Sequence, residues 1–252
     1  MRSALLATAF CALSGLAEAS CRQALALGLD VSGSVDAREY NLQMKGLAAA
    51  LDSPKVRQAL MILPGTPVHL LIYEWSGPED PTVVLPWTAV TGPQVLNGII
   101  GQLRSLERRQ ATPGTALGLA MREGVRHLNQ RTECWKRTLD LSGDGQSNLG
   151  PRPVDVKPEI EPTGITINAL VIGVDSQGIG DIRQSEISGL SAYFQSNVIV
   201  GEDSFVETAL GFEDYAAAMA RKLERELETL ILGQAPAPVS YTHLTLPTKR
   251  IV

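Results

Sequence analysis

The sequence predicts a doubly wound α/β domain, with a mostly parallel six-stranded sheet, helices on both faces and one antiparallel edge strand. Three observations predict this class. Short apolar runs that end in polar loops alternate with amphipathic segments of helical period, as in parallel sheets with crossover helices. The composition is that of a globular protein, with 44% hydrophobic and 19% charged residues. The chain also has enough residues for one domain with its own core.

The first element is a short, continuous apolar run that ends in a polar loop, as a buried parallel strand does. Pro86 removes a backbone donor from the third strand and so confines it to an edge of the sheet. The segments with the pattern of strands are Ala24–Asp30, Val68–Trp75, Thr82–Trp87, Thr138–Ser142, Ile165–Ile172 and Asn197–Val200.

The first helix begins with Asp36 and Glu39 at the spacing of a capping box. The segments with helical period are Asp36–Leu51, Gln94–Leu106, Thr115–Leu128, Asp181–Tyr193 and Glu213–Leu232. Within the last helix, the charged run Arg221–Glu228 is interpreted as a solvated face with i,i+4 pairs.

Both ends of the chain are set apart from the domain. Residues 1–19 have the pattern of a secretory signal, with Arg2 before an apolar stretch and a small-x-small site at Ala17–Ala19. The alternative is a buried N-terminal helix. We therefore expect a periplasmic or secreted domain over residues 20–234. Residues 235–252 form a Pro/Ala linker and a tail without either period, which resembles a translated sequencing adapter and is interpreted as artefactual.

Cysteine usage fits an exported protein. Removal of the signal leaves Cys21 and Cys134, each just before a predicted strand. An even pair in an exported protein indicates a disulfide, and the two sulfurs would meet if the two strands are parallel neighbours. The alternative is two separate buried thiols.

Charge and hydropathy exclude two classes of partner. The formal net charge is −5 at pH 7, which argues against a nucleic-acid binder that depends on phosphate contacts. Outside the first 20 residues no apolar run approaches the roughly 18 residues needed to cross a bilayer. We expect neither a nucleic-acid partner nor a membrane span.

Chemistry is concentrated in loops that leave strands, where ligands bind in open α/β sheets. Asp30, Ser32 and Ser34 follow the first strand at i, i+2 and i+4, so their side chains point to the same side. Asp144 follows a second apolar strand, and Thr115 begins a helix after a Pro-Gly loop. Two carboxylates, three hydroxyls and water make the all-oxygen ligand set that Mg²⁺, Mn²⁺ or Ca²⁺ prefers.

These motifs resemble the metal-ion-dependent adhesion site (MIDAS) of von Willebrand factor type A domains, which have a Rossmann-like fold. The stretches Arg137–Asn148, Tyr73–Gly77 and Phe212–Tyr215 are similar to an exported bacterial subgroup catalogued as domain of unknown function 1194. The resemblance covers roughly Gln23 to Leu232.

The resemblance implies a role for each matching residue. Ser32, Ser34 and Thr115 would ligate the cation through hydroxyls, with Thr115 bound directly or through water. Asp30 and Asp144 would act largely through bound water and hydrogen bonds. The ion would keep an open position for an acidic side chain of a protein partner, so that the metal is a bridge and the protein is not an enzyme. Thr112 is the alternative to Thr115.

Other interpretations have weaker support. Asp140, Ser142, Asp144 and Gly145 begin like a calcium loop, but the twelfth position holds Pro151 where an acidic ligand is needed. A metal-dependent hydrolase would need a catalytic base, and neither histidine of the domain lies at a predicted strand exit. A scaffold protein with a purely structural cation is the third alternative.

Overall fold

The computed structural model of the protein describes residues 21–79, 81–173 and 180–232. Its centre is a six-stranded sheet in the order β3-β2-β1-β4-β5-β6. Only β3 is antiparallel to its neighbour, which confirms the predicted mostly parallel sheet with one antiparallel edge strand. The strands are β1 Gln23–Asp30, β2 Val68–Trp75, β3 Thr82–Ala89, β4 Lys136–Gly143, β5 Thr166–Ile172 and β6 Val206–Ala209.

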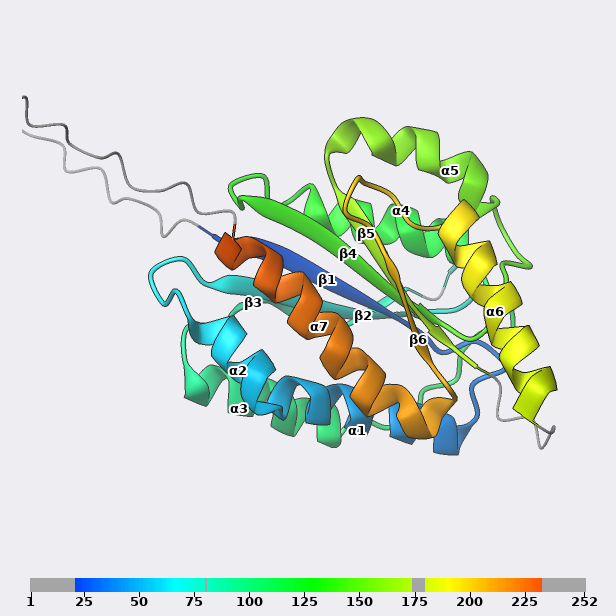
Figure 1. The fold of residues 1–252 in the computed structure, drawn as a ribbon, viewed down its shortest axis with the longest axis horizontal. Coiled ribbons are helices and arrows are strands. Elements are labelled where there is room, and N and C mark those ends of the chain that lie inside the picture. The colour runs from blue at the N-terminus through cyan, green and yellow to red at the C-terminus, as the bar shows by residue number, and fades with distance from the viewer. Residues whose placement is uncertain (1–20, 80, 174–179, 233–252) are drawn as a thin grey trace, which may run out of the picture.

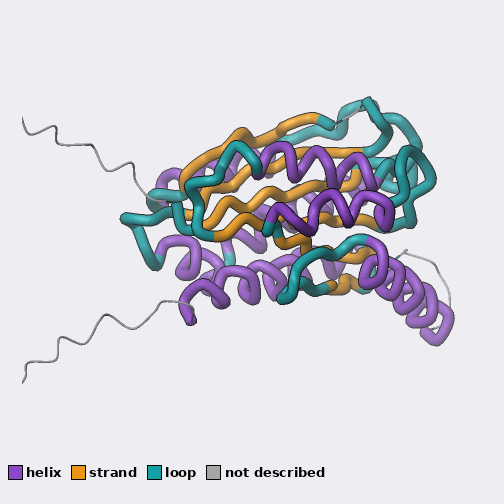
Figure 2. Tube along the Cα trace, turned by 90° about the horizontal axis from the view of Figure 1, so that it is seen from above, coloured by secondary structure: helices purple, strands orange, loops and turns teal. Residues whose placement is uncertain are grey.

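Helices cover both faces of the sheet (Figure 1), and the view from above shows its strands side by side (Figure 2). The helices are α1 Ala37–Asp52, α2 Pro54–Met61, α3 Pro93–Arg104, α4 Leu117–Leu128, α5 Pro153–Ile160, α6 Gly180–Asn197 and α7 Tyr215–Leu232, with short 3₁₀ turns at Glu161–Thr163 and Phe212–Asp214. The described part of the chain contains no helix with the length and apolar character needed to span a membrane.

Strand β1 shows why the sheet is apolar on both sides. All eight of its residues are buried, and successive side chains point to opposite faces. Leu25, Leu27 and Leu29 pack with α1, α2, α3 and α7, whereas Ala24 and Ala26 pack with α4, α5 and α6. Apolar packing therefore holds β1 on both faces of the sheet, and it fixes the position of the carboxyl end of the strand.

The predicted capping box and disulfide are both present. The Asp36 carboxylate accepts from the Glu39 backbone at 2.8 Å, and the Glu39 carboxylate accepts from the Asp36 backbone at 2.8 Å. Cys21 and Cys134 form a disulfide. They meet because β1 and β4 are parallel neighbours and each cysteine lies just before its strand.

Several elements differ from the prediction. The strand expected at Asn197–Val200 is wrong, because α6 continues to Asn197 and the sixth strand is β6. Val200 makes only an isolated bridge to Ile167. The run is apolar, β-branched and buried, as a strand would be, but the backbone donors of Val198 and Ile199 both bond to the Phe194 carbonyl and end the helix. The two eight-residue helices α2 and α5 were not predicted, and α4 begins at Leu117, which leaves Thr115 in a loop.

Candidate metal centre

The ends of β1 and β4 bring two of the predicted loops together. Leu29 pairs with Ser142 in the parallel ladder, so Asp30 and Gly143 end their strands side by side. A Cβ atom built on Gly143 would lie 3.5 Å from Asp30 Oδ2. The missing side chain leaves this carboxylate oxygen facing the loop that carries Asp144.

Four of the five predicted ligands form one chain of hydrogen bonds. The Ser32 backbone donates to Asp30 Oδ1 at 2.8 Å. Ser32 Oγ and Ser34 Oγ are 3.2 Å apart, and Ser34 Oγ donates to Asp144 Oδ1 at 2.8 Å. Residues 110 positions apart in the sequence are therefore in direct contact, as the strand-exit argument expected.

The loop of Thr115 is seated between the other two loops. On one side, Gly33 N donates to the Pro113 carbonyl at 3.0 Å. On the other, the Thr115 backbone donates to Asn148 Oδ1 at 2.8 Å and accepts from Asn148 N at 3.0 Å. Thr115 is buried, whereas Thr112 is exposed and lies against Gly77. The burial and the two-sided seat favour Thr115 over Thr112 as the residue at the site.

Gly33 is required by this seat. A Cβ atom at that position would come within 2.8 Å of Pro113 Cβ and 2.9 Å of its carbonyl oxygen. Real side chains do not approach this closely, so only glycine lets the loop after β1 pass against the loop of Thr115.

Asp30 is buried and Asp144 is half-buried, and neither has a counter-charge among the described residues. Asp30 is 1% exposed, and its Oδ2 has no hydrogen-bond partner among the described residues. Burial, followed by the charge of Asp144, raises the pKa of Asp30 to about 8. Burial also raises the pKa of Asp144. A bound cation would stabilise both ionised carboxylates.

The donor chemistry fits a hard divalent cation. Carboxylate and hydroxyl oxygens are the ligands that Mg²⁺, Mn²⁺ and Ca²⁺ prefer. Over the described ranges, no group of three or more His, Cys, Asp or Glu residues could hold a metal ion. The candidate centre has only two carboxylates, and hydroxyl groups make up the rest of its ligand set. It is therefore recognised by the spacing of its residues and by their position at strand ends.

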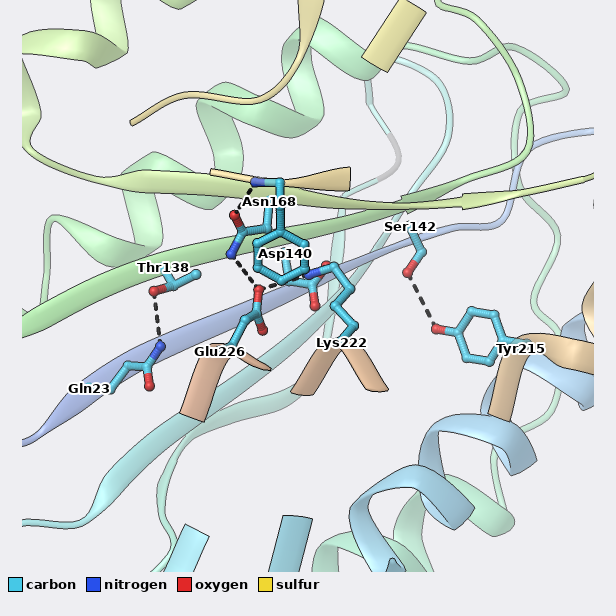
Figure 3. Close-up of polar contacts among 9 residues, drawn as sticks. Gln23, Thr138, Asp140, Ser142, Asn168, Tyr215, Lys222 and Glu226 are labelled. Carbon is cyan, nitrogen blue, oxygen red and sulfur yellow. Dashed lines mark hydrogen bonds and ion pairs between the residues drawn. The ribbon is translucent and has the colours of Figure 1, made fainter. Parts of the chain in front are cut away.

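The residues around the site hold the strand ends in place. Gln43 on α1 donates to the Asp30 carbonyl at 3.0 Å, and Val31 N donates to the Trp75 carbonyl at 2.9 Å. Ser142 Oγ lies 3.3 Å from the Tyr215 hydroxyl on α7 (Figure 3). Gln43 and Asn148 have no motif of their own in the sequence, although Asn148 lies in the stretch that resembles the bacterial subgroup.

The calcium-loop alternative is wrong. Asp140 is buried inside β4, and its carboxylate lies 2.6 Å from Lys222 Nζ on α7 (Figure 3). The interpretation of Arg221–Glu228 as a wholly solvated face is also wrong, because Lys222 and Glu226 are both buried. The helical period places Lys222 on the buried face of Tyr215 and Met219, but it does not reveal the partner of Lys222, which comes from a strand about 80 residues earlier in the chain.

This chain resembles a known family in sequence and solved structures in fold. A family model described as "Protein of unknown function (DUF1194)" matches residues 20–231. The chain belongs to this family. A search of curated proteins found no match.

Solved structures identify the fold of this DUF1194 protein as the von Willebrand factor type A fold. Proximal thread matrix protein 1 from the mussel byssus is 15% identical with a TM-score of 0.56, and the match covers 83% of this chain and 47% of that one. A von Willebrand factor type A protein from Catenulispora acidiphila is 15% identical with a TM-score of 0.53, covering 84% and 43%.

The pilus adhesin SpaC from Lactobacillus rhamnosus GG is 14% identical with a TM-score of 0.54, covering 84% of this chain and 31% of that one. This chain spans less than half the length of these three neighbours. At such identities the likeness shows the fold alone.

Proposed function

We propose that this DUF1194 protein is an exported binding module that engages a protein partner through a divalent cation. Asp30, Ser32, Ser34, Thr115 and Asp144 would hold the ion, which is Mg²⁺ in the first instance, with Mn²⁺ and Ca²⁺ as ions of the same ligand preference. The open position of the ion would take an acidic side chain of the partner.

One observation carries this proposal. The buried Asp30 carboxylate has an oxygen without a hydrogen-bond partner among the described residues, and it lies in the same hydrogen-bonded chain as Asp144. Burying a carboxylate without a counter-charge costs several kcal/mol. Without a cation the carboxyl group avoids this cost by keeping its proton, in line with the raised pKa of Asp30. A cation at this edge of the sheet would instead stabilise the ionised form.

The hydroxyls explain how the ion would remain able to bind a partner. A serine hydroxyl can donate its hydrogen while a lone pair remains available to a cation. Ser34 already donates to Asp144, so its remaining lone pair is free to face an ion. When bound, the metal supplies a positive charge that neutral hydroxyl ligands leave largely uncompensated. An incoming carboxylate would provide the missing negative charge.

The neighbours support this proposal. One structure of proximal thread matrix protein 1 is described with a zinc-occupied MIDAS motif, and SpaC is described as a pilus adhesin. Export is supported by the Cys21–Cys134 disulfide, because such bonds persist in oxidising compartments. The signal-like residues 1–19 and the tail after residue 234 lie outside the described residues.

Binding is favoured over hydrolysis by the position of the histidines. His69 lies near the start of β2, and His127 lies near the end of α4, 3.0 Å from Glu123. Neither is at the carboxyl edge of the sheet where Asp30 and Asp144 end their strands. No described histidine is therefore placed to act as a base at the candidate metal centre.

Titration calorimetry with MgCl₂ on chelator-treated protein tests the metal step. We expect one bound ion for the wild-type protein, loss of binding for Asp30→Ala and Asp144→Ala, and wild-type binding for Asp155→Ala. Asp155 is a matched control because it is an exposed aspartate paired only with Arg152 on the surface. Equal affinity of Asp30→Ala and Asp155→Ala for Mg²⁺ would reject the site.

A partner assay then separates a bridging ion from a structural one. A partner retained in Mg²⁺ should be released by chelator and should not be retained by Asp144→Ala. Retention that is unaffected by chelator would favour the scaffold alternative.

A further inference from the structure

Hydrogen bonds hold the loop between α3 and α4 at two places, one near Arg109 and one at Thr115 and Ala116. It runs over residues 105–116 without helix or strand and carries Thr115. Its last residues are seated by Ala116 N, which donates to the Ser76 carbonyl at 2.7 Å, and by the Asn148 contacts. Six residues before Thr115, a second set of contacts fastens the same loop to the sheet.

Arg109 is the centre of this second set. Its Nε donates to Glu74 Oε2 at 2.8 Å. The other oxygen of Glu74 accepts from the Tyr40 hydroxyl of α1 at 2.6 Å. The Glu74 side chain is 2% exposed, so both of its oxygens are committed in a nearly dry environment. Glu74 is therefore a fixed anchor for the loop.

The anchor lies beside the candidate metal centre. Glu74 pairs with Leu29 in the ladder between β2 and β1, one position before Asp30 pairs with Trp75. The preceding arginine, Arg108, reaches the carbonyls of Val31 and Ser32 from the same loop, at 3.4 and 3.3 Å. Two consecutive side chains thus tie the loop to the exits of both strands.

We infer that Arg109 and Glu74 are positioning residues that hold Thr115 at the metal centre, an inference that rests on the proposed function. The pair is partly buried, with the Arg109 side chain 27% and the Glu74 side chain 2% exposed. Such a pair contributes little net stability compared with apolar packing, because its charges lose hydration. Its geometry is specific, however. Releasing it should lower metal affinity more than it lowers the stability of the fold.

The test compares two arginines that lie close together in the sequence. In Arg109→Met the loop loses its anchor, whereas Arg104→Met removes an exposed ion pair with Asp52 at the end of α3. Magnesium affinity is measured by calorimetry with MgCl₂. Hydrogen exchange over residues 106–116 and thermal unfolding are measured in chelator.

For Arg109→Met we expect Mg²⁺ affinity to fall about tenfold or more, the range typical of residues that orient metal ligands. Exchange in the loop should be faster. The melting temperature should fall below that of Arg104→Met, because Arg109→Met leaves the buried Glu74 carboxylate without a counter-charge. Glu74→Gln removes that charge, and it should show the same loss of Mg²⁺ affinity with a melting temperature close to that of Arg104→Met. Arg109→Lys should recover part of the affinity. If Arg109→Met does not fold, Glu74→Gln replaces it, since it keeps the shape of the anchor and removes its charge.

Wild-type Mg²⁺ affinity in Arg109→Met would overturn the inference, and so would an equal loss in Arg104→Met. Failure of the wild-type protein to bind Mg²⁺ would instead reject the proposed function. In that case unchanged loop exchange in metal-free Arg109→Met would overturn the anchor as well, and faster exchange would support it.

Discussion

Two pairs of carboxylates in this domain lie wholly or partly out of solvent, and they differ in whether the chain supplies a counter-charge. Asp140 and Glu226 lie between β4 and α7, where Lys222 Nζ is 2.6 Å from one and 2.8 Å from the other. Asp30 and Asp144 lie at the carboxyl edge of the same sheet and have no ion-pair partner among the described residues. Lys222 supplies the positive charge for the first pair, and for the second pair we propose a cation taken from solution.

The Lys222 cluster shows two buried carboxylates with a counter-charge from the chain, although burial still raises the pKa of Asp140 to about 7. Lys222 is fully buried, and its two carboxylate neighbours raise its pKa against the effect of burial. Asn168 on β5 completes the cluster: its amide donates to Glu226 at 2.6 Å, and its oxygen accepts from Phe205 N at 3.0 Å (Figure 3). The candidate metal centre also has two carboxylates near the ends of neighbouring strands. Where the cluster has a lysine, the candidate centre has the neutral hydroxyls of Ser32 and Ser34.

Removing the internal cation should have the largest effect. Lys222→Met leaves Asp140 and Glu226 buried together without a counter-charge, and it should cost about 3–5 kcal/mol of unfolding free energy. Urea unfolding measures the loss. Arg221→Met is the control, because Arg221 lies next to Lys222 on α7 but its side chain is exposed and pairs with Glu207 and Asp214 at the surface. A loss below about 1 kcal/mol in Lys222→Met would contradict the comparison.

The second prediction concerns the pH dependence of the metal-free protein. Asp30 holds a proton up to about pH 8 in the folded state and loses it near pH 4 when unfolded. Between these values the unfolded chain binds fewer protons, so stability should fall as pH rises, by up to about 1.4 kcal/mol per pH unit. Unfolding of chelator-treated protein between pH 4 and pH 8 measures the slope.

Two controls isolate the contribution of Asp30. Asp30→Asn keeps an oxygen for the Ser32 backbone and removes the titration, so its slope should be smaller and its stability at pH 7 higher than that of metal-free wild type. Saturating Mg²⁺ should remove most of the slope in the wild-type protein. Stability that rises with pH equally in both proteins would contradict the assignment.

The smallest effect is expected at Gly33. In Gly33→Ala the new methyl group would push the loop of Thr115 away through Pro113, so Mg²⁺ affinity should fall several-fold at a stability cost of about 1 kcal/mol. Gly98→Ala is the control, because a Cβ at Gly98 meets no atom within 4 Å. Alanine there should leave Mg²⁺ affinity unchanged and stabilise α3 slightly. Equal Mg²⁺ affinity in both variants would show that the close approach does not matter.

Much of the fold and of the site geometry follows from short-range rules. Parallel pairing predicted that Asp144 would meet the loop after β1, and the disulfide followed from the same pairing. These two features depend on strand direction, which hydrophobic patterns indicate well. The extended chain expected over Asp30, Ser32 and Ser34 is wrong, because residues 32–35 form a turn in which Val35 N donates to the Ser32 carbonyl at 3.1 Å. The turn nevertheless brings the hydroxyl oxygens of Ser32 and Ser34 to 3.2 Å from each other.

The rest depends on contacts between distant segments. Three contacts each join residues more than 30 positions apart: Arg109 with Glu74, Asn148 with the Thr115 backbone, and Lys222 with Asp140. Helical period does distinguish Lys222 from the exposed Arg221 beside it, because Lys222 lies seven residues after the buried Tyr215 and three after the buried Met219. The period does not reveal which distant residue pairs with Lys222. The strand expected at Asn197–Val200 failed for a related reason, since the helix before it satisfies the backbone donors of Val198 and Ile199.

The most direct test is a crystal structure of the protein grown with MnCl₂, in which anomalous scattering locates the ion. The account predicts one strong peak at the carboxyl edge of the sheet, within bonding distance of Ser32 Oγ and Ser34 Oγ and next to the Thr115 hydroxyl. Well-ordered crystals with no anomalous peak at these hydroxyls would contradict it.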